Sequence, residues 1–306
     1  MKKLLKIYLS MILAGIIMTF TTSVVFAQDV LSVEDMNSVY KKEVTLNKKV
    51  QQYAPLREAD VMWKRKIWRE IDLREKMNHP LYYPENDGVG TTTGDRRSLI
   101  DVIYSAINEG SITAYGNAAM DDEFRQPMTQ EEIKLIGGAK SELVEVIDWD
   151  AVAAGADPED AKTQRLITKA FDRNSVKKWR LKEEWLFDKQ YSTMQVRIIG
   201  LAPLQEDRDE VTDRLIGSFS PLFWVHFPEA REILINAEVF NSVKNDAERR
   251  TYDDLFWKRM FNSTITMEAN VANRRINEYM VGLDALLEAE RIKAEIFHLE
   301  HDVWEY

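Results

Sequence analysis

The sequence predicts an α+β fold, in which helices mix with short antiparallel strands and the C-terminal part is rich in helices. Apolar and aromatic residues alternate with polar ones over residues 179–198, which is typical of two strands joined by a short loop. Apolar residues recur at helical spacing over residues 99–107, and again among the many charges of residues 278–304. Adjoining strands with helical segments before and after them indicate the mixed class.

Residues 1–27 predict a secretory signal peptide. Lysines among the first six residues precede an uncharged apolar run over residues 7–20, and a polar break leads to the triplet 25–27. This order of basic, apolar and small-x-small regions is typical of a cleaved signal. A retained anchor is the alternative, since about 20 uncharged residues can span a bilayer. The polar break interrupts the apolar run, so we expect cleavage after Ala27 and an exported protein.

The mature chain is expected to begin with an arm and then a helix. Residues 28–58 are polar and rich in lysine, which indicates an arm with weak order. Apolar residues then recur at helical spacing over residues 59–77, with Asp60 as the N-cap. Pro80 disfavours helical geometry at His79, so this helix is expected to end near residue 77.

The first predicted domain, residues 59–149, continues with short elements separated by loops. A helix over residues 99–107 is followed by Gly110, a suitable C-terminal stop. Residues 111–115 are a short strand candidate. Thr129 is followed by two glutamates, which predicts a helix start of the capping-box type.

Residues 150–160 are rich in Ala, Gly, Asp and Pro, and predict a linker between two domains. The second domain, residues 161–306, contains the two alternating strands, and residues 222–227 predict a further one. The chain after Pro228 is expected to be helical to its end, with breaks near residues 241–246 and 262–266. The last helix is expected to bury one apolar face, formed by Tyr279, Leu283, Leu286, Leu287 and Phe297.

Composition excludes several classes of site. The 306 residues include no cysteine, which rules out a disulfide framework, a cysteine nucleophile, a cysteine-based zinc site and an iron–sulfur cluster. The chain has 41 basic and 51 acidic side chains, a net charge of −10, and loss of the three signal lysines lowers this to −13. Because phosphate binding rests on Lys and Arg, we expect no nucleic-acid partner.

A search for catalytic or metal-binding patterns finds little. The glycine-rich loop of residues 88–94 lacks the Gly-Lys-Ser/Thr ending of a P-loop, so a plain surface loop is the simpler interpretation. Glu295, His298 and His301 lie three apart on one helix, but a carboxylate-bridged di-metal site needs a second such pair. A Ser-His-Asp triad that converges only in the fold stays open, although the sequence has no Gly-x-Ser-x-Gly elbow. We therefore predict no catalytic residue, metal ligand or cofactor.

Tryptophan is the unusual feature, with eight residues in one chain. Core packing is the ordinary explanation, because tryptophan is usually highly buried. An interface is the alternative, because Trp, Tyr and Arg are enriched there. The tripeptide Trp-Lys-Arg occurs twice, at residues 63–65 and 257–259, and joins an aromatic ring to two cations.

Long blocks of sequence carry a resemblance to a known family. They include Asp-Val-Met-Trp-Lys-Arg-Lys-Ile-Trp-Arg-Glu-Ile-Asp at 60–72, Ile-Asn-Glu-Gly-Ser-Ile-Thr-Ala-Tyr-Gly at 107–116 and Pro-Leu-Phe-Trp-Val-His-Phe-Pro-Glu-Ala-Arg at 221–231. A last block spans residues 255–306 and ends Glu-His-Asp-Val-Trp-Glu-Tyr. In these blocks, which extend over nearly all of the mature chain, the sequence resembles the GldN/PorN family of gliding-motility and type IX secretion components of the Bacteroidetes.

The resemblance implies a non-enzymatic structural protein of the periplasm. It implies self-association in a ring at the inner face of the outer membrane, together with an outer-membrane lipoprotein of the GldK/PorK type. It further implies contact with the periplasmic region of a motor component of the GldM/PorM type, and a requirement for protein secretion. The missing cysteine agrees with this, because the partner lipoprotein would bear the lipid.

The contact surface of such a subunit is expected on the two predicted amphipathic helices around residues 63–69 and 278–304, and at the second Trp-Lys-Arg. The candidate interface residues are Trp63, Lys64, Arg65, Trp68, Arg69, Trp257, Arg259 and Trp304. The alternative function is that of an exported ligand-binding protein or hydrolase with a Trp-lined cleft.

Overall fold

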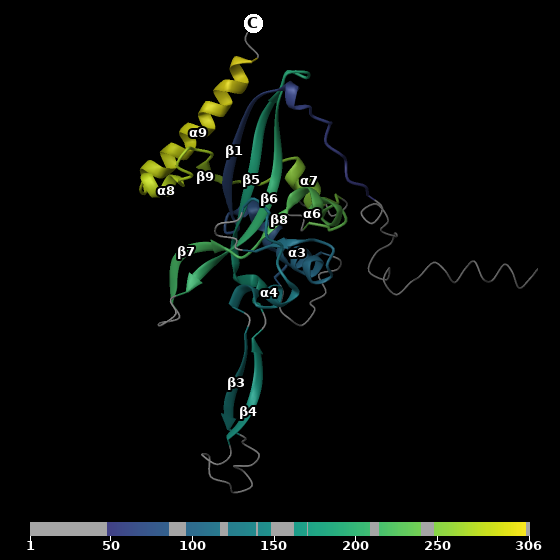
Figure 1. The fold of residues 1–306 in the computed structure, drawn as a ribbon, viewed down its shortest axis with the longest axis vertical. Helices are drawn as coiled ribbons and strands as arrows, with labels where there is room; N and C mark the ends of the chain where they lie inside the picture. Colours follow the sequence, from purple (N-terminus) through teal and green to yellow (C-terminus); the bar gives the residue numbers. More distant parts are fainter. Residues whose placement is uncertain are drawn as a thin grey trace, which may run out of the picture. The chain divides into compact units, whose positions relative to one another are not determined.

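A long β-hairpin forms the centre of the fold in the computed structural model of the chain (Figure 1). β5 (Val176–Asp188) and β6 (Thr193–Arg208) pair antiparallel around a turn at residues 189–192. This confirms the two strands predicted from alternation. β1 (Val61–Asp72) pairs with β5 on the side away from β6, so β5 has a partner on both of its edges.

The hairpin belongs to an antiparallel sheet of seven strands, in the order β2–β8–β6–β5–β1–β9, with β7 paired to β6 off this path. The remaining strands are β2 (Ala114–Tyr115), β7 (Leu215–Pro221), β8 (Trp224–His226) and β9 (Thr264–Glu268). The α-helices are α2 (His79–Tyr82), α3 (Leu99–Asn108), α4 (Gln130–Lys134), α6 (Phe227–Leu234), α7 (Tyr252–Trp257), α8 (Ile276–Tyr279) and α9 (Leu283–Asp302). Short 3₁₀ turns lie at Glu58–Asp60, Lys76–Asn78, Ile136–Gly138 and Arg173–Ser175. Helices combined with antiparallel strands confirm the predicted α+β class.

The structure describes residues 48–85, 96–116, 122–138, 140–147, 162–169, 171–208, 214–239 and 248–303. The predicted signal peptide, most of the predicted arm and the predicted linker at residues 150–160 lie outside these ranges, and those predictions stay predictions.

Strands from both sides of the predicted linker share the seven-stranded sheet. β1 pairs with β5, and β2 pairs with β8. The segments that flank the linker, β3 (Lys140–Ile147) and β4 (Lys162–Lys169), form a separate two-stranded antiparallel sheet. Lys48–Tyr306 is one compact unit, so the two predicted domains are joined through their strands.

Residues 59–77 do not form the predicted helix; they contain β1 instead. Ile67 and Ile71 lie on one face of the sheet and Trp68 on the other, and all three are buried because both faces are covered here. A strand packed on both faces carries apolar residues at neighbouring positions, which hides the period of two and imitates helical spacing. The ladder with β5 stabilises the extended form, since it bonds the backbone of β1 along its length.

The main hydrophobic core lies between one face of the sheet and helices α3, α6 and α7. Trp179 of β5 has no exposed surface there, and the rings of Phe227 and Phe256 meet edge to face at 5.4 Å. Tyr252 is fully buried, and its hydroxyl donates a hydrogen bond to the backbone carbonyl of Arg97 at 2.7 Å. Burial raises the pKa of Tyr252, so the phenol stays neutral.

A buried ion pair connects α6 to α7 within this core. Arg231 Nε and Nη2 donate to Asp253 Oδ1 and Oδ2 at 2.7 and 3.2 Å. The side chains are only 3% and 9% exposed, so neither charge is solvated. Such a pair is stable only while both partners are present, because a lone buried charge strongly destabilises the fold.

A smaller cluster covers the opposite face of the sheet, where Trp68, Trp224 and Met267 are buried. The ring of Phe124 packs on this cluster from a backbone with φ of +59°. A Cβ atom at Gly200 would lie 2.5 Å from that ring. Glycine is therefore required at position 200 for Phe124 to cover this face.

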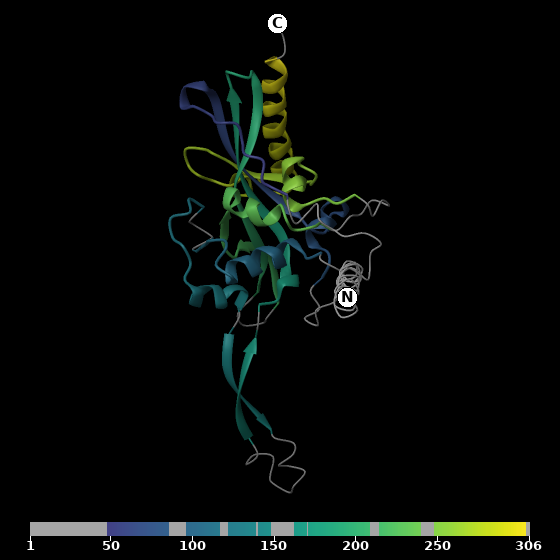
Figure 2. The same ribbon diagram turned by 90° about the vertical axis from the view of Figure 1, so that its right-hand side faces the viewer.

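α9 lies along the sheet (Figure 2). It packs there through a face that the sequence pattern does not single out. Ala289, Ile292 and Ile296 are buried against Ile67 of β1 and Ile265 of β9. The prediction of its buried face is wrong, because α9 carries two apolar stripes and only the sheet surface selects between them. The residues predicted to be buried are exposed: Tyr279 (38%), Leu283 (70%), Leu286 (56%), Leu287 (59%) and Phe297 (62%).

Several local signals are confirmed. Thr129 and Glu132 form the reciprocal capping box of α4, and Gly110 follows α3 with φ of +76°. The segment 262–266, predicted as a break between helices, leads into β9, because the edge of β1 supplies a ladder that no local pattern shows. Among the described helices, none is both long enough and apolar enough to cross a membrane.

Alanine substitutions on the two stripes of α9 should differ sharply in effect. Ile292→Ala removes a fully buried side chain and is expected to lower the free energy of unfolding by about 2–5 kcal/mol. Leu287→Ala, on the exposed stripe, should change it by less than about 0.5 kcal/mol. Urea unfolding followed by tryptophan fluorescence measures both, and equal losses would contradict the assignment of the faces.

Removal of one partner from the buried ion pair should strongly destabilise the fold. Asp253→Asn leaves Arg231 without its counter-charge and is expected to lower the free energy of unfolding by about 3–5 kcal/mol. Arg74→Gln is the control, since it breaks a surface pair with Asp72 that contributes about 0–1 kcal/mol. The double variant Arg231→Met, Asp253→Leu should recover part of the loss. Similar urea midpoints for Asp253→Asn and Arg74→Gln would refute the prediction.

Candidate interaction surface

The five candidates on β1 divide between the two faces of the sheet, because successive side chains of a strand point to opposite sides. Trp63, Arg65 and Arg69 share the face on which Ile67 meets α9, whereas Lys64 and Trp68 point to the opposite face. Trp63 packs against the cluster under α9, and the Arg65 guanidinium lies 5.5 Å from the centre of its ring. The Trp-Lys-Arg tripeptide is thus a strand segment that presents its Trp and Arg together.

Arg65 and Trp68 both contact other parts of the fold. Arg65 forms ion pairs with Glu268 of β9 at 3.3 Å and Glu295 of α9 at 3.2 Å, which connect the helix to the sheet. Trp68 is 8% exposed, and its indole N–H donates to Asp122 Oδ2 at 2.8 Å. Trp68 therefore packs in the core, which is the ordinary position of a tryptophan.

Trp257 is 44% exposed and belongs to a stack of aromatic rings and cations. The ring of Tyr53 lies 5.0 Å from it, nearly parallel. The Arg231 guanidinium lies 4.7 Å from the Tyr53 ring and 5.0 Å from the Trp257 ring, and Arg197 lies 5.1 Å from Tyr53. Of these residues, Tyr53, Arg197 and Trp257 border a pocket of about 510 Å³ beside β6. The stack anchors the segment that precedes β1 on α7.

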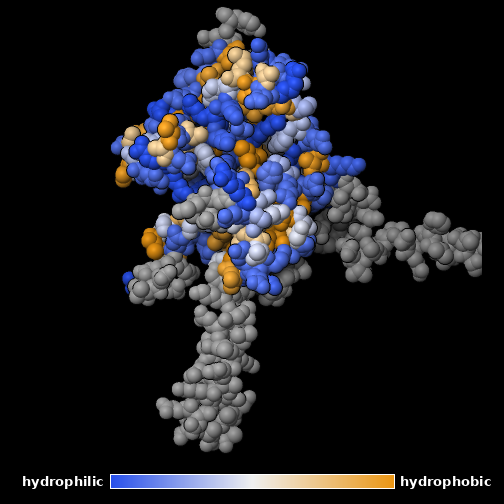
Figure 3. All heavy atoms as spheres, in the orientation of Figure 1, coloured by the Kyte–Doolittle hydropathy of each residue, from blue (hydrophilic) through white to orange (hydrophobic). Residues whose placement is uncertain are grey.

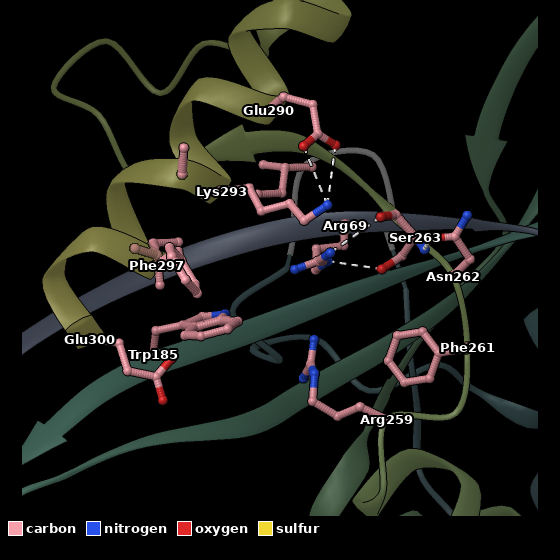
Figure 4. A pocket seen from close by; sticks show the side chains of 13 residues that line it. Arg69, Trp185, Arg259, Phe261, Asn262, Ser263, Glu290, Lys293, Phe297 and Glu300 are labelled. Atoms are coloured by element: carbon pink, nitrogen blue, oxygen red, sulfur yellow. Dashed lines mark hydrogen bonds and ion pairs between the residues drawn. The ribbon is translucent and has the colours of Figure 1, made fainter.

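Arg69 and Arg259 come together in a second pocket, of about 440 Å³ (Figure 4). It lies between α9, strands β1 and β5, and the loop after α7. Trp185, Phe261 and Phe297 line it with aromatic surface. α9 also contributes the charged side chains Glu290, Lys293 and Glu300.

Glu183, a fully buried carboxylate on β5, lies beside this pocket. Arg259 Nη2 is 3.0 Å from its Oε1 and 3.2 Å from its Oε2, and the Trp185 indole N–H donates to Oε2 at 3.1 Å. The Arg259 guanidinium also lies 5.5 Å from the Trp185 ring and 5.4 Å from the Phe261 ring. Arg259 therefore neutralises a buried acid and packs between two aromatic walls.

Arg259 reaches Glu183 from a strained backbone. It follows α7 with φ of +52°, and the N–H groups of Arg259 and Met260 bond to the carbonyls of Phe256 at 3.2 Å and Leu255 at 2.9 Å. This is the Schellman ending of a helix, a position that favours glycine. An arginine there costs about 1–2 kcal/mol in backbone strain. The ion pair with Glu183 offsets that strain.

Arg69 differs from Arg259 because it has no ion pair with any described carboxylate. Its Nε and Nη2 donate to the hydroxyl and the backbone carbonyl of Ser263 at 2.9 and 3.2 Å. Burial lowers the pKa of Arg69; the negative charges of Glu183 and Glu290 oppose this effect, and the positive charge of Arg259 adds to it. The guanidinium faces the pocket with hydrogen-bonding capacity that Ser263 does not use.

An exposed apolar stripe on α9 runs to this pocket. Leu283, Leu286, Leu287 and Phe297 recur on one side of the helix, and each is more than half exposed. Phe297 belongs to both the stripe and the pocket. Figure 3 shows apolar surface over α8 and the start of α9. Exposed apolar side chains that recur on one side of a helix are typical of a site of interaction with other molecules.

The site combines predicted residues with others that sequence reasoning missed. Arg69 and Arg259 were predicted, whereas Glu183, Trp185 and Phe297 were not. Glu183 carried a usable signal, because it interrupts the apolar series on the inward-facing side of β5, where a charge needs a buried partner. Phe297 lies in the segment 278–304 where contacts are expected, but the sequence pattern assigns it to the buried face of the helix, whereas it is exposed. Trp304 lies outside the described residues, and within those residues no three His, Asp or Glu side chains gather to hold a metal ion.

Replacement of Arg259 should show whether the buried ion pair stabilises the fold by more than the strained backbone of Arg259 destabilises it. Arg259→Gly relieves about 1–2 kcal/mol of strain but leaves Glu183 buried without a counter-ion, at a cost of about 3–5 kcal/mol. We therefore expect a lower urea midpoint. Adding Glu183→Leu to this variant should recover most of the loss, because it removes the buried carboxylate that has lost its counter-ion. An unchanged urea midpoint for Arg259→Gly alone would show that the burial of Glu183 does not depend on Arg259.

Comparison with known proteins adds a family to this description. The family model of the gliding motility associated protein GldN matches residues 56–305, a range that contains all the described strands and helices. The comparison with curated proteins finds no match. The family match extends over more than half of the chain and includes the blocks at residues 60–72 and 221–231. The chain therefore belongs to the GldN family of gliding motility associated proteins.

Proposed function

We propose that this gliding-motility component is a non-enzymatic structural subunit of the type IX secretion machinery, in a ring at the periplasmic face of the outer membrane. The family match is the observation that carries the proposal. The partners are further copies of the chain, an outer-membrane lipoprotein of the GldK/PorK type and the periplasmic region of a GldM/PorM-type motor component. Cleavage after Ala27 would release the chain into the periplasm.

The surface supports this proposal in physical terms. A ring subunit needs at least two different contact surfaces, because head-to-tail association joins unlike faces. The exposed stripe of α9 offers one apolar surface, and the partly exposed ring of Trp257, stacked on Tyr53, offers an aromatic one. Aromatic residues and arginine are the residue types that contribute most to binding energy in protein interfaces.

The size of the native particle should identify the function. In a mild-detergent extract, the chain is expected to elute as a particle far larger than its 35.6 kDa and together with a lipoprotein. A periplasmic enzyme of similar mass in the same extract is the control. Deletion of the gene should abolish both protein secretion and gliding.

Two outcomes would contradict the proposal. A particle of monomer mass in cells would exclude a ring. Intact secretion after gene deletion, together with binding of a small ligand to the pure chain, would favour an exported ligand-binding protein or hydrolase. Its cleft would then be either the pocket lined by Trp185 or the pocket lined by Trp257.

A further inference from the structure

We propose that the Arg69 pocket and the exposed stripe of α9 form one docking site for a partner segment that carries a single carboxylate among apolar side chains. The site consists of Arg69, Trp185, Phe261 and Phe297 in the pocket, and of Leu283, Leu286 and Leu287 on the stripe. This inference deepens the proposed function, and it rests on that function only in taking the partner to be another component of the machine.

The carboxylate follows from the state of Arg69. Its guanidinium is bonded only to Ser263 among the described residues, whereas nearby Arg259 is already paired with Glu183. A partly buried guanidinium presents a planar fork that matches a carboxylate, and such charge-assisted pairs are stronger than neutral hydrogen bonds. A carboxylate of the partner would pair with the Arg69 guanidinium, which has no ion pair with any described carboxylate.

A single carboxylate, rather than an acidic run, follows from the other charges of the pocket. Lys293 is engaged with Glu290, at 3.3 Å from both carboxylate oxygens. Glu300 lines the same pocket and would repel a second negative charge. The walls around Arg69 are aromatic and aliphatic, so the groups beside the carboxylate should be apolar.

A protein segment, rather than a small carboxylic acid, follows from the length of the surface. The stripe from Leu283 to Phe297 runs about 21 Å at the helical rise of about 1.5 Å per residue. A small acid would fill the pocket and leave Leu283, Leu286 and Leu287 exposed. A segment of a few helical turns, or an extended strand, covers both parts at once.

Photo-crosslinking in cells tests the proposal on the full chain. p-Benzoylphenylalanine replaces Phe297 or Leu287 in separate variants, and Tyr191, an exposed aromatic residue of the β5–β6 turn, is the control position. We expect both test positions to cross-link to the same segment of one partner, which contains an Asp or Glu between apolar residues, and Tyr191 to leave that segment unlabelled.

Charge exchange then decides the role of Arg69. Arg69→Gln should reduce the yield of the cross-link about tenfold or more, as expected for loss of one charge-assisted pair. Arg69→Lys should retain more of it. Replacing the partner's acid by Arg should abolish the cross-link, and Arg69→Glu should restore it in that background. If Arg69→Gln lowers the thermal midpoint, Leu287→Asp on the exposed stripe serves instead and should weaken the cross-link without unfolding the chain.

The possible failures are distinguishable. A cross-link that Arg69→Gln and Leu287→Asp leave unchanged, a segment without an acidic residue, or a second copy of this chain with no carboxylate at the site would overturn the docking proposal. So would quenching of Trp185 by a small carboxylic acid that also blocks the cross-link. In each case a large native particle would still support the ring, whereas a monomer would refute the ring itself.

Discussion

The pairing of β5 on both of its edges is the interaction on which the rest of the structure depends. β6 follows it through a short turn, but β1 comes from more than a hundred residues earlier in the chain. Once β1 is in register, Ile67 lies opposite Glu183 and Arg69 opposite Leu181. This register brings together residues of the main hydrophobic core, of the cluster under α9 and of the pocket. β1 in this position also provides the edge on which β9 pairs. β9 in turn supplies part of the surface on which α9 packs.

A line of charge crosses the face of the sheet between two apolar clusters. On β1, Arg69 lies between Ile67 of the cluster under α9 and Ile71 of the main core; on β5, Glu183 lies between Trp185 and Leu181 in the same way. Burial of ionised groups is unfavourable unless they are paired. The chain meets this requirement for Glu183 with Arg259, held in a strained conformation, whereas among the described residues Arg69 is bonded only to Ser263. A well-packed apolar face needs neither charge, and the arrangement agrees with the docking role that we propose for the pocket.

Elements set by neighbouring residues could be predicted from the sequence, and elements set by distant contacts could not. The alternation around Trp185, the capping box at Thr129 and the stop at Gly110 each depend on a few adjoining residues, and all three are confirmed. β1 was mistaken for a helix because its two faces are both covered. The candidate site followed the same rule: Arg69 and Arg259 were chosen for their residue types, but the pocket that joins them needs β1, β5 and the loop after α7 in place.

Local patterns in the sequence predict the α+β class, the central hairpin, the end of α3 and the start of α4, and its long blocks predict the family. These properties reside in local pattern and in residue identity, which the chain carries before it folds. Which stripe of α9 is buried depends on the surface that the folded sheet presents to it. Ile292 and Ile296 match the surface of β1 and β9, and the leucines on the other side of the helix remain exposed. The physical reason is that burial is a property of two surfaces, and a single helix specifies only one of them.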